Sequence, residues 1–593
     1  MESDTTFVAP EGVYTVIEEH RPSVLQNHAA STSPLQFPAK VSVITVKYPL
    51  EKIKDSALAA SLAQLLGGNK DLKKEKAVKE KDDGISLSSS DTPPDEQIDE
   101  VPSSPTYSTP LFSPSAGRKP KQPTPAKWSK PKHNLKTTSS TFITRVQNAE
   151  GFPRNIRDRD GETTFFFYNQ VKTILWVEAG AKSKEPFIRI TFSSYPTCHS
   201  INNLTASPER LDVIIGFNTG DIIWIDPISS RYSRLNKGGC ITPGACTAVR
   251  WVPGSASLFL ASHADGTIVV YDRDREDGAF VPTQPGLEWD PRESIFVTIP
   301  PWHPGTSHDG EGGHSGALDI SLSLSENTTN KSEKSDKSIK NPVSHWRVSP
   351  KGKPVVDFVF SPDVKYVGAI SEDGCLRVID ALAEQLLDCY SSYFGALTCI
   401  AWSPDGRFVL AGGQDDLITI FSPWEQRVVA RCQGHSSFVS CVAFDEGRSE
   451  DGRTYRFGSV GEDNKLILWD FSSGALHRPK TPYTHHSHHN AQSHSQPHGH
   501  KQSLNNGMSS SALYLPKTTS TSPLIDGEVD AEMRPRYHPA PSRNEIAVVQ
   551  PVLVTFLPKH VLTSTKNGVV KLWVRPLQAL QSGKPRRVGS GAI

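Results

Sequence analysis

The stretches VVDFVFSPDVKYVGAISEDGCLRVID (355–380) and ALTCIAWSPDGRFVLAGGQDDLITIF (396–421) decide the fold of this 593-residue chain. Each begins with an apolar run that meets Ser-Pro-Asp, which is typical of a tight turn. After a second apolar run, Asp373 or Asp415 stands six residues before the bulky Ile379 or Phe421. Because Asp can hydrogen-bond its own backbone at a turn, and β-branched and aromatic residues favour strands, each stretch predicts antiparallel strands joined by tight turns.

The turn residue and the bulky residue after it form a repeat. The six pairs are Asn218 with Trp224, Asp265 with Tyr271, Asp373 with Ile379, Asp415 with Phe421, Asp463 with Trp469, and Asn567 with Trp573. The bulky residues are 47, 108, 42, 48 and 104 residues apart, so three gaps match a four-stranded blade and two contain insertions. One more copy, FFFYNQVKTILWVE (165–178), places Trp176 48 residues before Trp224. The sequence therefore predicts an all-β, seven-bladed β-propeller with long disordered insertions.

The ends of the chain set the domain boundaries. A ring requires a strand upstream of Phe165 to complete the first blade or to close against residues 569–574, and two segments qualify: KVSVITVKY (40–48) and TFITRV (141–146). We expect an N-terminal segment with a candidate ring-closing strand at 1–50, a disordered insertion at 51–140, the propeller at 141–578 and a flexible tail at 579–593. Within the propeller we expect disordered insertions at about 274–345 and 472–544.

One blade contains Gly434, His435, Asp463, Trp469 and Asp470. This set resembles the Gly-His and Trp-Asp residues of the WD-repeat family. The resemblance implies that His435, Ser459, Asp463 and Trp469 form a buried hydrogen-bonded chain that orders the blade. Such a role is structural, so these residues are not predicted to be catalytic.

Composition narrows the class of protein. The 64 basic and 64 acidic side chains cancel, which argues against nucleic acid as the partner. No run of about 18 apolar residues and no signal sequence is present, so we expect no membrane partner and a protein that is not secreted. The eight cysteines contain no CxxC pair, which favours a reducing compartment. We therefore expect a cytoplasmic protein that also has access to the nucleus.

The predicted insertions contain several features that bear on partners. Residues 58–68 have the apolar spacing of a short helix, and a tract with four Ser/Thr-Pro dipeptides follows it. Residues 117–136 hold seven basic residues and no acidic one, which is typical of a basic linker or a nuclear-import signal. In the insertion after residue 274, Phe280 and Trp289 are candidate contact points within sequence that is polar enough to be mostly disordered.

Catalytic and metal-binding patterns give little support for an enzyme. The region 485–500 contains seven histidines: His485, His486, His488, His489, His494, His498 and His500. It is a low-complexity stretch with no nearby carboxylate or cysteine, so we predict no dedicated metal site. The motifs of serine hydrolases, zinc proteases, P-loop enzymes and kinases do not occur. We predict a protein without catalytic residues or cofactors.

Longer segments give a narrower resemblance. They are EGVYTVIEEHRP (11–22), TFITRV (141–146) with FFFYNQVKTILWVE (165–178), PTCHSIN (196–202), GFNTGDIIWIDP (216–227), WSPDG (402–406) and GHSSFVSCVAFD (434–445). Together the chain is similar to the CreC-type proteins of fungal carbon catabolite repression and their animal relatives, which are WD-repeat cofactors of deubiquitinating enzymes. The resemblance implies a non-catalytic scaffold whose partner is a CreB-type ubiquitin-specific protease, together with other ubiquitin-pathway proteins.

Two alternatives stay open at this stage. A substrate receptor of a cullin-type ubiquitin ligase often carries Trp-Asp-x-Arg/Lys, but here Trp469-Asp470 is followed by Phe471-Ser472. A nuclear, transcription-associated scaffold would use the basic stretch that begins at Arg118. The two readings differ in whether ligase components or DNA bind the chain.

Sequence gives no firm interface residue. Arg250, Trp251, His263, Phe394 and Trp402 are aromatic and basic residues near predicted loops, the types enriched at protein interfaces. Because Trp251 and Trp402 lie in apolar strand runs, we expect both in the core. The residues that bind the partner are therefore left unassigned.

Overall fold

A computed structural model describes ten segments of the chain: residues 5–9, 11–22, 38–49, 129–135, 140–152, 154–181, 185–303, 339–448, 453–473 and 551–576. The chain divides into residues 1–48 with 114–593, which hold the sheets, and residues 49–113, of which only Pro49 is described.

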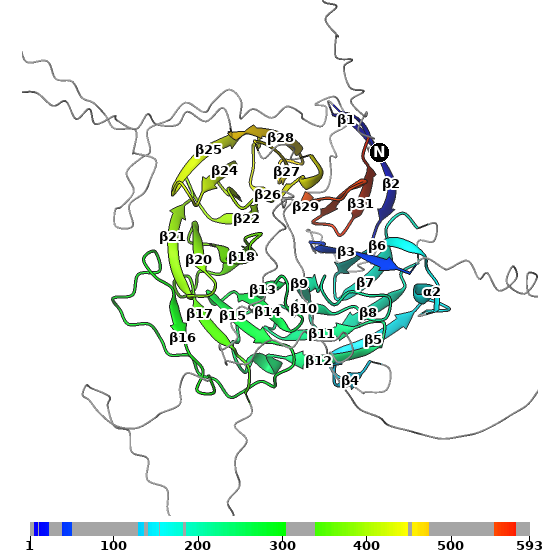
Figure 1. Cartoon of the computed structure of the whole chain (residues 1–593), viewed down its shortest axis with the longest axis horizontal. Coiled ribbons are helices and arrows are strands. Elements are labelled where there is room, and N and C mark those ends of the chain that lie inside the picture. The colour runs from blue at the N-terminus through cyan, green and yellow to red at the C-terminus, as the bar shows by residue number, and fades with distance from the viewer. Residues whose placement is uncertain are drawn as a thin grey trace, which may run out of the picture. The chain divides into compact units, whose positions relative to one another are not determined.

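Seven β-sheets stand around a central axis as the blades of a propeller (Figure 1), which confirms the predicted fold class. From the centre outward, blade one is β3–β6–β7–β8–β5 (Val41–Tyr48, Gly161–Gln170, Thr173–Glu178, Ile188–Phe192, Ile143–Asn148). Blade two is β9–β10–β11–β12–β4 (Pro196–Ile201, Val213–Phe217, Ile222–Asp226, Arg231–Leu235, His133–Asn134). Blade three is β13–β14–β15–β17–β16 (Cys246–Trp251, Leu258–His263, Thr267–Asp272, Ser344–Arg347, Phe296–Thr298). Blades four to seven are β18–β19–β20–β21 (Val355–Phe360, Tyr366–Ser371, Cys375–Asp380, Gln385–Ser391), β22–β23–β24–β25 (Leu397–Trp402, Val409–Gly413, Leu417–Ser422, Arg427–Gln433), β26–β27–β28 (Val439–Phe444, Thr454–Gly461, Leu466–Ser472) and β29–β30–β31–β2–β1 (Pro551–Phe556, His560–Thr565, Val570–Val574, Gly12–His20, Thr6–Ala9). Helices are short: α2 (Arg154–Arg157), η1 (Lys237–Gly239) and η3 (Glu446–Arg448).

The repeated turn residues lie where the sequence predicts them, between the second and third strands of their blades. In blade four, the Asp373 carboxylate accepts hydrogen bonds from Ser371 Oγ (2.7 Å) and from the backbone N–H of Cys375 (3.1 Å). The Ser-Pro-Asp turn before it is held in a similar way, because Ser361 Oγ donates to Asp363 (2.6 Å) and accepts from the N–H of Tyr366 (2.9 Å). Short polar side chains thus fix both turns of the blade by bonding to the local backbone.

The core consists of apolar layers between neighbouring blades. Five tryptophans are among its largest fully buried side chains: Trp176, Trp224, Trp346, Trp469 and Trp573. Between blades five and six, Trp469 stacks on Phe457 with 5.9 Å between ring centroids. Burial of an aromatic side chain of this size contributes roughly 2–3 kcal/mol, so each interface between blades holds several such contributions.

Ring closure uses a strand that the sequence did not single out. Both predicted candidates, 40–48 and 141–146, belong to blade one, as its innermost strand β3 and its outermost strand β5. The strand that pairs with β31 is β2, so blade seven combines both ends of the chain (Figure 1). Glu18 of β2 also joins blades seven and one, because its buried carboxylate accepts a hydrogen bond from the N–H of Gly180 (2.7 Å).

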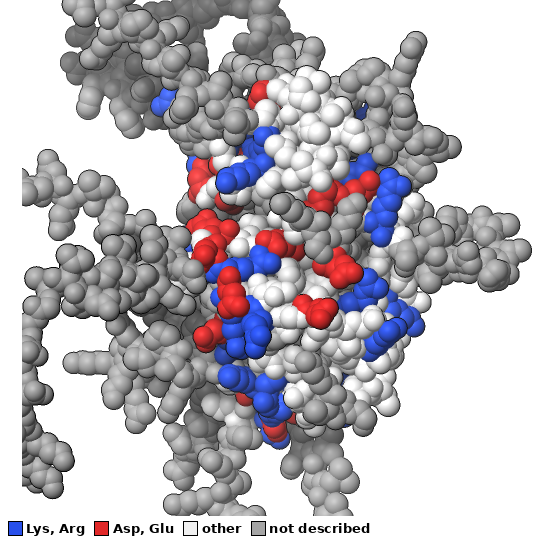
Figure 2. Space-filling view, turned by 90° about the vertical axis from the view of Figure 1, so that its right-hand side faces the viewer, with Lys and Arg blue, Asp and Glu red and all other residues white. Residues whose placement is uncertain are grey.

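The outward face of the N-terminal hairpin β1–β2 carries exposed apolar side chains. Val8, Val13 and Ile17 are all at least half exposed, and Val574 of β31 lies beside Thr15 in the same sheet. Figure 2, which shows the side of the ring that contains this hairpin, has an uncharged area in its upper part and mixed charges below it. The opposite face of the hairpin, with Phe7 and Tyr14, packs on the core.

Parts of two predicted insertions are ordered. Residues 274–303 are described, and Phe280, predicted as a contact point in mostly disordered chain, is buried beside Trp302 (6.3 Å between rings). Residues 129–135 at the end of the basic stretch are described and include β4 on the outer edge of blade two, where Arg231 donates to the carbonyl of Pro131 (2.6 Å). The remaining predicted insertions and the tail, including the histidine-rich stretch, lie outside the described residues.

Two buried histidines make stability depend on pH. Burial lowers the pKa of His199, between blades one and two, and of His345, in blade three, to about 4. The unfolded chain, with an ordinary pKa near 6.5, therefore binds more protons below pH 6.5, and stability falls as pH drops from 6.5 toward 4. We expect about 2 kcal/mol to be lost for each histidine between pH 7 and pH 5, measured as the free energy of urea unfolding.

His345 offers the sharper variant, since neither of its ring nitrogens has a hydrogen-bond partner among the described residues. His345→Leu should remove about 2 kcal/mol of the pH 5 loss while leaving stability at pH 7 nearly unchanged. The exposed His133→Gln serves as the control and should keep the wild-type pH dependence. An unchanged pH dependence in His345→Leu would show that this histidine titrates normally in the folded protein.

Candidate functional site

The repeated turn residues mark one end of the ring. Successive strands of a blade run antiparallel, so the turn between the second and third strands lies at the same end as the loop that leads into the innermost strand. We call this end, which carries Asn218, Asp265, Asp373, Asp415, Asp463 and Asn567, the turn face. Loops on it that carry large exposed side chains are the candidates for binding a partner.

The loop between β21 and β22 presents two aromatic rings on the turn face. Tyr393 is 58 % exposed and Phe394 is 71 % exposed. The loop is held by blade five, because the Asp415 carboxylate accepts from the N–H of Tyr393 (3.3 Å) and Gln414 Oε1 accepts from the N–H of Ala396 (3.0 Å). The Arg431 guanidinium lies 5.4 Å from the centre of the Tyr393 ring. Both rings are therefore presented on a fixed backbone.

The next loop, between β25 and β26, is fixed in the same way and carries Phe438, which is 41 % exposed. Asp463 accepts from the N–H of Ser436 (3.0 Å), and the carbonyl of Phe438 accepts from the N–H of Glu462 (2.8 Å). Burial alone would raise the pKa of Asp463, but its hydrogen bond with His435 lowers it overall. The carboxylate that holds this loop is thus ionised at neutral pH.

Blade five lies between these two loops, so Tyr393, Phe394 and Phe438 flank one blade. We call these three residues the aromatic surface. A third loop repeats the arrangement between blades one and two, where Asn218 Oδ1 accepts from the N–H of Tyr195 (3.1 Å) and Lys172 Nζ lies 4.7 Å from the Tyr195 ring centre. The turn residue of the repeat therefore also positions the aromatic residues of the loop before the blade.

The chemistry of the aromatic surface suits a protein partner. Exposed phenylalanine and tyrosine side chains are large, mostly apolar and rotate about only two side-chain bonds, so their burial on binding costs little conformational entropy. Loops held by backbone hydrogen bonds reduce this cost further, because little ordering is left for the binding step. The surface is thus built for binding a protein.

The four residues of the predicted blade network lie together inside blade six. His435 Nδ1 is 3.0 Å from Asp463 Oδ1, and His435 Nε2 is 2.7 Å from Ser459 Oγ, which accepts a hydrogen bond from Trp469 Nε1 at 2.8 Å. With the proton on Nδ1, His435 donates to the carboxylate and accepts from the serine hydroxyl. The chain of hydrogen bonds runs from the core tryptophan to the loop that carries Phe438.

Of the five interface candidates taken from the sequence, Phe394 alone is highly exposed. Trp251 is buried, and Trp402 is partly buried and stacks with Tyr366 (6.5 Å), in agreement with their expected place in the core. His263 is fully buried, and Arg250 bonds to Asp357 of the next blade (2.9 and 3.0 Å). Sequence reasoning missed Tyr393 and Phe438, although Phe438 stands in the segment GHSSF three residues after His435.

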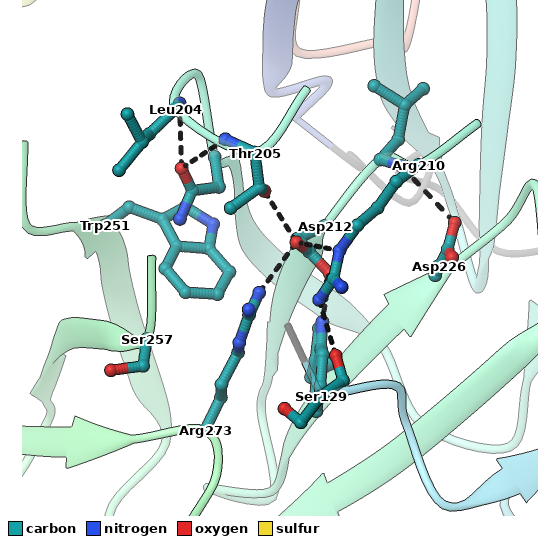
Figure 3. Close-up of polar contacts among 12 residues, drawn as sticks. Ser129, Leu204, Thr205, Arg210, Asp212, Asp226, Trp251, Ser257 and Arg273 are labelled. Atoms are coloured by element: carbon teal, nitrogen blue, oxygen red, sulfur yellow. Dashed lines mark hydrogen bonds and ion pairs between the residues drawn. The ribbon is translucent and has the colours of Figure 1, made fainter. Parts of the chain in front are cut away.

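A buried ion cluster between blades two and three also escaped the sequence analysis (Figure 3). The Asp212 carboxylate accepts from Thr205 Oγ1 (2.5 Å), Arg210 Nε (2.7 Å) and Trp224 Nε1 (2.9 Å), and forms an ion pair with Arg273 Nη1 (2.6 Å). Burial would raise the pKa of Asp212, but the two guanidinium groups lower it overall. Because Asp212 is fully buried, the cluster cannot reach a partner.

No three His, Cys, Asp or Glu side chains of the described segments are arranged to hold a metal ion. Likewise, none of the described helices has the length and apolar character needed to span a bilayer.

Comparison with known proteins gives the family. The WD domain, G-beta repeat model matches residues 385–422 and 426–470, which cover the two loops of the aromatic surface. The chain is 34 % identical over 451 residues to the "UBP9-binding protein bun62" of Schizosaccharomyces pombe, an alignment that covers 74 % of this chain and 75 % of that protein. The protein belongs to the WD-repeat family that includes bun62, as the resemblance noted in its sequence predicts.

Proposed function

We propose that this protein is a non-catalytic scaffold that binds a ubiquitin-specific protease through the aromatic surface and stabilises or activates it. The observation that carries the proposal is the exposure of Tyr393, Phe394 and Phe438 on two loops that flank blade five and are held by Asp415 and Asp463. The name of bun62, which records binding to UBP9, supports a deubiquitinase as the partner. The resemblance to CreC-type proteins extends the proposal to a CreB-type protease acting in carbon catabolite repression, in the cytoplasm and the nucleus.

The mechanism needs no reactive group on the propeller. A partner that binds only the folded protease lowers its unfolded fraction in proportion to the occupancy of the complex. A partner that binds one arrangement of the protease more tightly than another shifts the protease toward that arrangement. In both cases the protease, and not the propeller, carries out the cleavage of ubiquitin.

The test is a double substitution on the aromatic surface. Phe394→Ala with Phe438→Ala should weaken binding to a CreB-type protease about 100-fold or more, since truncating central aromatic residues of an interface costs roughly 1–2 kcal/mol or more each. Binding is measured by calorimetry with purified proteins, and protease activity by cleavage of a fluorogenic ubiquitin substrate. Activation by the propeller should be lost in parallel with binding.

Trp424→Ala is the matched control, because Trp424 is 70 % exposed and lies in the turn between β24 and β25, at the opposite end of the same blade. It should bind the protease with wild-type affinity. Unchanged affinity in the double variant would reject the aromatic surface as the site. Capture of cullin-ligase components or DNA with no protease would reject the proposed function.

A further inference from the structure

Two cysteine thiols meet between blades two and three. Cys198 of β9 and Cys246 of β13 stand on the innermost strands of these blades, and their sulfur atoms are 3.6 Å apart. The two strands are held close to each other, since Thr197 Oγ1 donates to the carbonyl of Cys246 (2.6 Å) as well as to that of Gly216 (3.1 Å). These hydrogen bonds from the Thr197 side chain to backbone carbonyls therefore fix the approach of the two thiols.

Gly216 of β10 makes room for both sulfur atoms. A Cβ atom at this position would lie 2.5 Å from Cys246 Sγ and 2.7 Å from Cys198 Sγ, which no real contact allows. Because Gly216 has no side chain, the two thiols can lie side by side over this position of the strand. Both are buried, Cys198 at 7 % exposure and Cys246 at 1 %.

The equivalent position between blades five and six shows that packing does not require the second thiol. There Thr398 Oγ1 donates to the carbonyls of Gly412 (3.0 Å) and Val439, and a Cβ at Gly412 would meet Cys399 Sγ at 2.7 Å and Val439 Cγ1 at 2.6 Å. Valine takes the place that Cys246 takes between blades two and three. Because a valine side chain packs in this place, the packing of two neighbouring blades does not require a second thiol there.

The surroundings of the two thiols shift their pKa values in opposite directions. Burial alone would raise the pKa of Cys198, but hydrogen bonds with Cys246 and Thr197 lower it overall. The hydrogen bond to Cys198, together with burial, raises the pKa of Cys246. Cys198 is thus the better nucleophile of the pair, and Cys246 is the thiol placed to react with it. By contrast, burial and the neighbouring Asp277 carboxylate raise the pKa of the exposed Cys240 to about 11.

We propose that Cys198 and Cys246 form a reversible disulfide when the protein meets a hydroperoxide, and that this bond links blades two and three. The Cys198 thiolate attacks the outer oxygen of the hydroperoxide, the O–O bond breaks, and the alkoxide leaves and takes up a proton as the alcohol. The Cys246 sulfur, on losing its proton, attacks the resulting sulfenic sulfur, the S–O bond breaks, and water leaves. Two thiols lose two electrons and two protons, and the hydroperoxide is reduced to an alcohol and water.

The geometry permits the bond and gives it a measurable effect. The sulfur atoms need to approach from 3.6 Å to about 2.05 Å, a change that side-chain rotation above Gly216 can supply. The bond would close a loop of 48 residue steps, from 198 to 246. Because the cross-link restricts the unfolded chain, we expect the oxidised protein to melt at a Tm about 4 °C higher.

The experiment treats the full-length protein with hydrogen peroxide and maps its peptides without reduction after free thiols are alkylated in denaturant. The expected result is a peptide that joins Cys198 to Cys246, formed before Cys240 is oxidised, with the rise in Tm reversed by dithiothreitol. Cys246→Val, which copies the arrangement at Val439, should fold normally, show no rise in Tm and leave a sulfenic acid at Cys198 that dimedone traps. Cys432→Val removes a buried thiol elsewhere, in β25, and should behave like the wild type.

Any of three results would overturn the proposal. In the first, both thiols are still alkylated after Cys240 has been oxidised, which would mean that the pair does not react. In the second, the disulfide forms no faster than the protein unfolds, measured by raising urea stepwise at fixed peroxide, which would make it a product of the unfolded chain. A Cys246→Val protein that gains the same Tm rise would also assign the effect to another residue.

Discussion

Removal of residues 1–21 is expected to abolish the folded propeller. The deletion takes away β1 and β2, and leaves β31 with an unpaired edge and the core without Phe7 and Tyr14, which pack with Trp573. Burial of these two aromatic side chains contributes roughly 2–3 kcal/mol each, before the backbone pairing of β2 is counted. Since a folded domain is stable by only about 5–15 kcal/mol, the loss approaches its whole stability.

The measurement is the yield of monomer in size-exclusion chromatography, followed by thermal unfolding monitored by circular dichroism. Little monomer and no cooperative transition are expected. Addition of a peptide with residues 5–22 should restore part of the transition, because the missing strand can pair with β31 from a separate chain. Deletion of 579–593, beyond the last described residue, is the control and should leave Tm unchanged. A wild-type Tm after the N-terminal deletion would show that β2 does not close the ring.

Local sequence signals were enough to predict the blades. Asp373, Asp415 and the other turn residues bond to backbone groups a few residues away, so the same short pattern produces the same hairpin in each blade. A seven-sheet ring follows from the count of these hairpins. The place of the Phe394 loop at one end of the ring could be predicted as well, because the loop directly precedes β22, the innermost strand of blade five.

Features that depend on distant residues could not be read in this way. The segment of β2 alternates between buried and exposed residues as many strands do, and nothing in it indicates that its partner β31 lies 550 or more residues away. Likewise, the polar residues around Phe280 resemble disordered chain, whereas the structure buries this ring against Trp302. In both cases tertiary packing, which a single sequence does not display, decides the outcome.

Asp212→Ala is expected to cost about 3–5 kcal/mol of unfolding free energy, the range for removing one partner of a buried ion pair. The side chains of Asp212 and Arg273 are 0 % and 1 % exposed, so the Arg273 guanidinium would stay in the core with only its longer ion pair, from Nε to the Asp274 carboxylate (3.4 Å). It is enclosed by two indoles, with Trp224 at 4.7 Å and Trp251 at 5.6 Å, which cannot replace a carboxylate. Trp224 Nε1 and Thr205 Oγ1 would lose their acceptor as well.

A second substitution separates the effect of the unpaired Arg273 charge on stability from the effect of lost packing. Arg273→Met in the Asp212→Ala background should recover part of the lost free energy, because the thioether side chain fills the space between the two rings without a charge. Glu162→Ala, which breaks the exposed ion pair with Lys47, should change stability by less than about 0.5 kcal/mol and controls for the loss of an ion pair as such. The free energies are measured by urea unfolding at pH 7. A cost below about 1 kcal/mol for Asp212→Ala, or no recovery in the double variant, would mean that water or the Asp274 carboxylate compensates the charge of the buried Arg273 guanidinium.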